Sequence, residues 1–153
     1  MSRRYFSAAV LATALAASTV YAMSNNVISA FRGQLVISKD ELPEGKNDSD
    51  TIKKIKAAQL KELNGEPHGD VSAWSFHYTA FLSSKGAAKL KMEFLKDGKL
   101  SADKMIDGID PKNGVIAGDI TIDEDEGVAK GKTYQVELAS GNNVVAKTTV
   151  TLK

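Results

Sequence analysis

The two histidines, His68 and His77, are the side chains best suited to acid–base or metal chemistry in this chain of 153 residues. Imidazole titrates near neutral pH and is both the usual general base and a common metal ligand. Neither histidine lies in an H-E-x-x-H motif, and the chain has no G-x-S-x-G nucleophile motif. The sequence therefore favours a protein that is not an enzyme, and a small hydrolase that uses His68 or His77 is the catalytic alternative.

Cysteine is absent from the chain, which excludes disulfides, thiol catalysis, iron–sulfur clusters and cysteine-ligated zinc. Glycine-rich phosphate-binding motifs are also missing. The formal net charge is +1, whereas proteins that bind nucleic acid are usually strongly basic. Neither a nucleotide cofactor nor a nucleic-acid partner is expected.

Carboxylates gather in one short segment, where five of eight consecutive residues are acidic. Ca²⁺ prefers roughly six to eight oxygen ligands, which acidic loops often supply. The spacing is not that of an EF-hand loop, and alternation along a strand sends neighbouring side chains to opposite sides. We favour a solvated turn here. The alternative is a calcium site, the one cofactor considered, formed by Asp119, Asp123, Asp125 and Glu126.

The first segment of the chain has the parts of an export signal. Arg3 and Arg4 precede an apolar run at residues 5–17, and Val20 and Ala22 are residues that signal peptidase accepts at its cleavage site. The apolar run is shorter than the roughly 20 residues that a membrane-spanning helix needs. We therefore predict cleavage after Ala22 and no stable membrane span afterwards.

The predicted cleavage separates a signal peptide, residues 1–22, from a single domain, residues 23–153. The whole chain is 42% hydrophobic and 25% charged, as is usual for globular domains. The signal predicts a secreted or periplasmic protein. Export through the Sec pathway is favoured, and the paired arginines leave the twin-arginine pathway as an alternative.

One α-helix is predicted at about residues 50–63. Ser49 or Asp50 offers a side-chain oxygen to the free amides of the first turn. Asn64-Gly65 suits a left-handed helix end, and Pro67 prevents continuation. Apolar residues at helical spacing predict that one face of the helix packs on a sheet.

The lysines of this predicted helix and one phenylalanine are the candidate contact residues. No aromatic residue lies among the lysines, which favours a solvated helix face over a surface for an anionic partner. Phe81 is expected on the polar face of its strand, where it either lies beneath the helix, as we favour, or contacts a partner. The candidate binding surface comprises Lys53, Lys54, Lys56, Lys61 and Phe81.

Alternation of apolar and polar residues dominates the rest of the chain and predicts β-strands. The first strand is expected at residues 31–38. The clearest runs, residues 71–82 and 88–94, are separated by a short connection that contains glycine, so we expect them to pair as a hairpin. In that hairpin Phe81 would lie near Leu95.

Four further segments follow before the chain ends. Residues 100–106 are expected to form an irregular edge after a tight turn at Asp97-Gly98. Regular strands are expected at residues 115–122, 133–139 and 144–152. Six or seven short strands at this spacing favour an antiparallel sandwich over a βαβ array.

The segment Gly131–Leu138, a turn, and then Val144–Leu152 resemble the end of an immunoglobulin-like or fibronectin-III-like module of secreted bacterial proteins. In such modules a tyrosine early in the penultimate strand often bonds back to the preceding corner, a role that the resemblance implies for Tyr134. The fold implied is an antiparallel immunoglobulin-like β-sandwich of six or seven strands, with one α-helix inserted after the first strand. The function implied is recognition, adhesion or spacing.

These observations predict a secreted, non-catalytic β-sandwich module that binds or adheres to another macromolecule, either a protein or a cell-surface or matrix component. The alternative is a structural subunit of an envelope or extracellular assembly that pairs through its terminal strand. Lys147 and Lys153 argue against such pairing, because charged side chains commonly protect open strand edges. A monomer or a weak homo-oligomer is expected.

Overall fold

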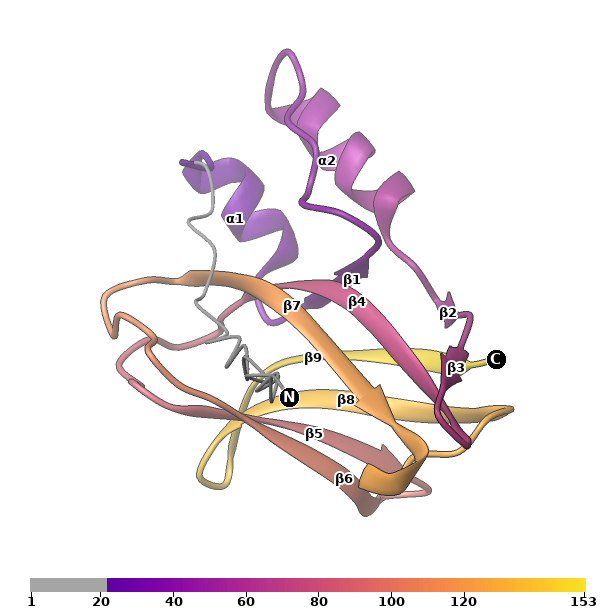
Figure 1. Cartoon of the computed structure of the whole chain (residues 1–153). Coiled ribbons are helices and arrows are strands. Elements are labelled where there is room, and N and C mark those ends of the chain that lie inside the picture. Colours follow the sequence, from indigo (N-terminus) through magenta and orange to yellow (C-terminus); the bar gives the residue numbers. More distant parts are fainter. Residues whose placement is uncertain (1–21) are drawn as a thin grey trace, which may run out of the picture.

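The computed structural model describes residues 22–153 of the chain. The predicted signal peptide, residues 1–22, therefore lies outside the described residues except for Ala22 and stays a prediction. Two β-sheets pack face to face, and two helices lie on the outer side of the smaller sheet (Figure 1).

The smaller sheet is built around one long central strand. One edge of this strand pairs along most of its length with a single antiparallel neighbour, and its other edge pairs with two short strands at opposite ends. The four strands are β1 (Leu35–Ser38), β3 (Glu66–His68), the central β4 (Val71–Phe81) and its long neighbour β7 (Val115–Asp123).

The larger sheet has the order β2-β9-β8-β5-β6, in which β2 runs parallel to β9 and the other pairs are antiparallel. In immunoglobulin terms, β4 and β7 take the places of the paired strands B and E, and β5, β8 and β9 take those of C, F and G. The predicted antiparallel immunoglobulin-like β-sandwich is confirmed. The strands are β2 (Glu62–Leu63), β5 (Leu90–Lys96), β6 (Lys99–Ile106), β8 (Lys132–Ser140) and β9 (Asn143–Leu152).

The core lies between the two sheets, and large aromatic side chains from both sheets fill it. Trp74, Phe94 and Tyr134 are buried there, and the rings of Phe94 and Tyr134 meet edge to face with centroids 6.5 Å apart. Burial of each such side chain stabilises the fold by roughly 1.5–3 kcal/mol. The indole Nε1 of Trp74 donates to the carbonyl of Lys153 at 3.1 Å, which ties the chain end to the core.

The corner before β8 confirms the role that the resemblance implied for Tyr134. Its hydroxyl oxygen accepts a hydrogen bond of 2.8 Å from the backbone N–H of Ala129, five residues upstream. This is the tyrosine corner of immunoglobulin-like sandwiches. It fixes the chain where it enters the larger sheet from the smaller one.

The prediction of a strand over residues 31–38 is wrong at its start. A helix that the sequence analysis missed, α1 (Asn25–Phe31), precedes the strand, which begins only at Leu35. The Ser24 hydroxyl caps α1 by accepting from the Val27 N–H at 3.3 Å. Val27 and Phe31 are one helical turn apart and both are buried, so they form a short apolar face of the helix. The alternation of apolar and polar residues that begins at Phe31 made this segment look like the start of the strand. The described part of the protein has two α-helices, and one of them precedes the first strand.

The second helix, α2 (Asp48–Ala58), is shorter than the predicted range of about 50–63. Beyond Gln59 the backbone is extended because it forms hydrogen bonds with strands of both sheets. The N–H of Leu60 donates to the carbonyl of Ile37 at 2.7 Å, and the carbonyl of Lys61 accepts from Thr151 at 2.9 Å. Pairing with strands on both sides overrides the helical spacing of these residues.

The predicted hairpin between residues 71–82 and 88–94 is wrong, because β4 and β5 belong to different sheets. The connection after β4 crosses to the larger sheet, where the N–H of Ser83 donates to the carbonyl of Val145 at 2.9 Å. Phe81 consequently lies opposite Val115 of β7 rather than near Leu95.

Residues 100–106 belong to the edge strand β6, whose pairing with β5 is regular except at one point. Phe94 pairs with Ala102 and Leu95 with Leu100, which leaves Ser101 as an extra residue on β6, so the expected irregular edge is present as a single bulge. The tight turn at Asp97-Gly98 is confirmed, with φ angles of 53° and 77° that suit the reversal between paired strands.

Candidate functional site

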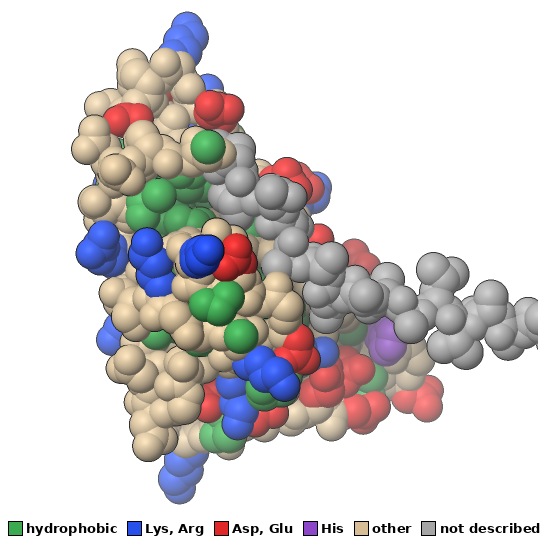
Figure 2. Space-filling model, turned by 90° about the vertical axis from the view of Figure 1, so that its left-hand side faces the viewer, with side chains coloured by type: hydrophobic (Ala, Val, Ile, Leu, Met, Phe, Trp, Pro, Cys, Tyr) green, Lys and Arg blue, Asp and Glu red, His purple; other side chains and the backbone are tan. Residues whose placement is uncertain are grey.

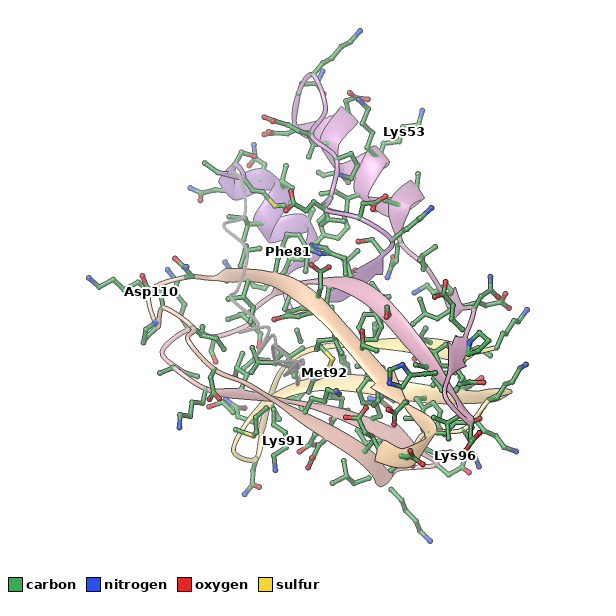
Figure 3. All side chains as sticks on the ribbon, in the orientation of Figure 1. Lys53, Phe81, Lys91, Met92, Lys96 and Asp110 are labelled. Carbon is green, nitrogen blue, oxygen red and sulfur yellow. The ribbon has the colours of Figure 1, made fainter. Side chains whose placement is uncertain are left out.

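The helices form a small second core on the outer face of the smaller sheet. Phe81 is buried there, with its ring centroid 5.1 Å from that of Phe31. Figure 3 shows Phe81 between the sheet and the helices, while Lys53 points away from α2. The Asp48 carboxylate joins the helices by accepting from Ser24 Oγ at 2.7 Å and Asn26 Nδ2 at 2.9 Å, and these bonds lower its pKa. Phe81 thus supports the helices and has no exposed surface to offer a partner.

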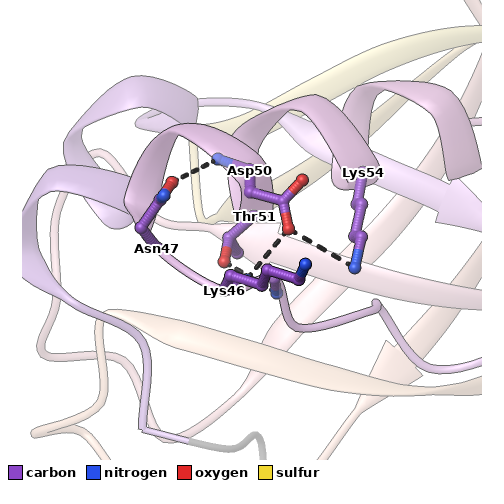
Figure 4. Close-up of polar contacts among 6 residues, drawn as sticks. Lys46, Asn47, Asp50, Thr51 and Lys54 are labelled. Atoms are coloured by element: carbon purple, nitrogen blue, oxygen red, sulfur yellow. Dashed lines mark hydrogen bonds and ion pairs between the residues drawn. The ribbon is translucent and has the colours of Figure 1, made fainter.

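The four candidate lysines do not form one surface. Lys53, Lys54 and Lys56 lie on α2, whereas Lys61 lies beyond the helix at the edge of the larger sheet. On the helix, Lys54 Nζ lies 3.4 Å from the Asp50 carboxylate, which also accepts from the N–H of Lys46 (Figure 4). The face of the molecule in Figure 2 carries both basic and acidic side chains. These features fit a solvated helix face.

The two histidines occupy separate places. His77 is buried on the outer face of β4, and its Nδ1 lies 2.9 Å from an oxygen of Asp119, whose side chain is 76% exposed. His68 is exposed on β3 and pairs with Val71, six residues before His77 on β4. Six residues of strand span roughly 20 Å. The two imidazoles therefore cannot share a metal ion or act on one bond.

The acidic segment is occupied by contacts within the chain. Asp123 and Glu126 cap each other's backbone N–H groups across the short helix η1 (Glu124–Glu126), at 3.2 and 2.9 Å. Glu126 also lies 2.7 Å from Lys104 Nζ, and Asp119 is bound to His77. Residues 22–153 hold no group of three or more His, Asp or Glu side chains that would suit a metal ion. These acidic side chains, with the exposed Asp125, form a capped turn at the end of β7.

A different place, the outer edge of β9, leaves backbone groups available. The two ends of this edge are covered, because the chain touches it at Gln34 before entering β1 and again at Lys61 after α2. The N–H of Lys147 donates to the carbonyl of Gly33 at 3.1 Å, and the N–H of Thr151 donates to the carbonyl of Lys61 at 2.9 Å. Between these bonds, Thr149 has no strand residue in register on that side.

Thr149 directs its peptide groups into this gap. Alternate residues of a strand present N–H and C=O to the same side, so Thr149 shares the direction of Lys147 and Thr151, away from β8. A groove of about 440 Å³ opens there, within the range of roughly 300–1,000 Å³ that is usual for ligand sites. We call it the β9 groove, and it is lined by Gln34, Gln59, Lys61, Gln135, Lys147, Thr148 and Thr149.

The chemistry of the β9 groove suits binding. Its lining offers amide, hydroxyl and ammonium groups, with no carboxylate, imidazole or aromatic side chain among the lining residues. An acid–base pair for catalysis is therefore missing from the lining. Lys61 was a candidate residue because of its place in a predicted helix, and Lys147 was expected only to protect a strand edge. The other lining residues carry no signal in the sequence, because they come together only through the crossing of the chain between sheets.

No family model matches the sequence, and no curated protein matches it either. Among solved structures, the chain is similar to an immunoglobulin-like protein from Pseudomonas aeruginosa, with 12% sequence identity and a TM-score of 0.40. The similarity covers 78% of this chain and 90% of that protein. No helix within residues 22–153 is long and apolar enough to cross a membrane.

Proposed function

We propose that this protein is an exported, non-catalytic binding module that recognises another macromolecule through the β9 groove. The observation that carries the proposal is the interruption of the β9 ladder at Thr149 inside a groove lined by polar side chains. A free backbone donor and acceptor, with side-chain amides and ammonium groups beside them, can bind a partner through hydrogen bonds and charge without catalysing a reaction. The signal peptide predicted at residues 1–22 supports export.

The alternative hydrolase has less support. His77 is buried on the outer face of β4 and is bound to Asp119, so a substrate would have to displace packed side chains to reach it. His68 is exposed, and none of the side-chain hydrogen bonds or ion pairs of residues 22–153 involves its ring. Replacing both histidines leaves binding through the β9 groove intact, because neither lines it.

The alternative of a structural subunit that pairs through its terminal strand also has less support. β2 and Gln34 already pair with the outer edge of β9, so a second chain finds no continuous edge there. Measuring the mass of the protein in solution over a wide concentration range tests this alternative. A monomer throughout agrees with the proposal, and an oligomer that is lost when β9 is altered contradicts it.

Crosslinking in the exporting cell tests the proposal. A photoreactive residue replaces Gln135, which lines the β9 groove, or Ser101, which lies outside the groove on the edge strand β6, two strands away from β8, and serves as the control position. We expect a discrete crosslinked product from position 135 alone. The charge reversals Lys61→Glu and Lys147→Glu remove this product, whereas Lys99→Glu on β6 preserves it. Equal products from both positions, or a product insensitive to the reversals in the groove, would contradict the proposal.

A further inference from the structure

We infer that the β9 groove takes an acidic peptide segment in an extended conformation, one residue of which completes the β9 ladder at Thr149. The inference rests on the proposed function and names the chemistry of the partner. It depends on the backbone groups in the gap, on the two lysines beside it and on how the nearby carboxylates are occupied.

The backbone in the gap matches a peptide. Lys147 and Thr151 mark its ends, four residues apart, which corresponds to roughly 13 Å of strand. Thr149 at the centre presents a donor and an acceptor on the same side. A peptide residue supplies an acceptor and a donor at the same spacing, whereas a phosphate or sulfate ion has no donor for the Thr149 carbonyl. The covered ends limit full pairing to about one residue, so the rest of the segment must leave along the groove.

The charge of the groove matches an acidic segment. Lys61 and Lys147 are exposed and lie on either side of the gap, and neither takes part in an ion pair within residues 22–153. Acidic side chains at alternate positions of an extended peptide point to the same side, where one carboxylate can approach either lysine. Two such contacts together contribute about tenfold to the affinity, and they weaken as salt increases.

Two carboxylates close to these lysines in register or sequence have other partners. Glu137 faces Lys147 across β8 and β9, and its carboxylate accepts from Gln135 Nε2 at 2.6 Å. Glu62, which follows Lys61, lies 2.7 Å from Lys153 Nζ. Neither carboxylate forms an ion pair with a lysine of the groove, so a ligand carboxylate can approach both lysines directly.

Binding of a defined peptide to the isotopically labelled full-length mature protein tests the inference by NMR. The probe is Ac-Glu-Val-Glu-Val-Glu-NH₂, and Ac-Lys-Val-Lys-Val-Lys-NH₂ is its charge-reversed control. We expect the acidic peptide to shift the amide signals of Thr149, Lys61 and Lys147 and to slow hydrogen exchange at Thr149. The basic peptide produces neither effect.

Variants separate the two parts of the inference. Lys61→Gln with Lys147→Gln weakens peptide binding at least tenfold, whereas Lys99→Gln with Lys130→Gln, a pair of exposed lysines outside the groove, leaves it within twofold. Thr149→Pro removes the N–H that faces the gap and no bond to β8. It removes the shifts that the acidic peptide produces at Lys61 and Lys147, provided that circular dichroism shows the fold intact. Binding that survives the lysine pair overturns the inference.

A second NMR probe, an acidic sugar, distinguishes a failure of this inference from a failure of the proposed function. If an oligogalacturonate shifts Thr149 and the peptide does not, the peptide inference fails while the groove remains a binding site. If the crosslinks from position 135 persist and neither probe binds, the inference again fails alone. If the crosslinks and both probes fail, the proposed function falls with it.

Discussion

Removing the hydroxyl of Tyr134 tests how much the tyrosine corner before β8 contributes to the free energy of unfolding. Tyr134→Phe preserves the buried ring and its edge contact with Phe94 but deletes the oxygen that accepts from Ala129 at 2.8 Å. The lost hydrogen bond and the partly desolvated N–H left behind together cost about 1–2 kcal/mol of the free energy of unfolding. Ala129 is exposed, so water replaces part of the bond and keeps the cost at this level.

Urea denaturation measures the effect, with Tyr78→Phe as the matched control. Both tyrosines are buried, at 2% and 3% exposure, but the side-chain hydrogen bonds of residues 22–153 include the hydroxyl of Tyr134 and not that of Tyr78. With a dependence on urea of about 2 kcal/mol per M, the middle of the usual range, we expect the midpoint for Tyr134→Phe to fall by about 0.5–1 M at an unchanged slope. Tyr78→Phe keeps the buried ring and removes no side-chain hydrogen bond of residues 22–153, so it changes stability by less than about 0.5 kcal/mol. Equal effects of the two variants would refute the role of the corner.

Three further outcomes follow from the same contacts. Asn47→Ala removes the oxygen that accepts from the Asp50 N–H at 2.9 Å and is expected to destabilise the protein by about 1 kcal/mol in the same urea assay. Burial, with a smaller effect of the Asp119 charge, raises the pKa of Tyr78 to about 12 from 10.0, so stability is lost as the pH rises from 10 towards 12. This loss is at most roughly 2–3 kcal/mol and is absent in Tyr78→Phe, so a decline that persists in the variant has another source. Calcium is expected to change the melting temperature no more than magnesium at equal concentration, because Asp123 and Glu126 already cap each other's backbone N–H groups. A rise in the melting temperature with calcium alone would instead support the alternative of a calcium site.

The sequence was most informative where one residue's role is local. The alternation of β4 and β8 places Trp74 and Tyr134 in the core, and the corner bond of Tyr134 needs only the five residues before it. The turn at Asp97-Gly98 is local as well. Short-range pattern and turn chemistry therefore predicted the sandwich and its inward residues.

The sequence was least informative about which strands pair with one another. Nothing in the short connection after β4 reveals that the chain crosses to the other sheet at Ser83, so the predicted hairpin was wrong. The extended path after Gln59 likewise depends on Ile37 and Thr151, far away in the chain. The β9 groove arises from these long-range choices, and for this reason none of its backbone features could be predicted from the order of residues.

Hydrogen exchange at single amides of the free protein tests the β9 groove most directly, without any ligand. The N–H groups of Lys147 and Thr151 are bonded to the chain that covers β9, while Thr149 between them faces the open gap. We predict that the amide of Thr149 exchanges at least a hundredfold faster than those of both neighbours. An amide of Thr149 as protected as the amides of Lys147 and Thr151 would show that the edge is closed and would contradict the binding site assigned to it.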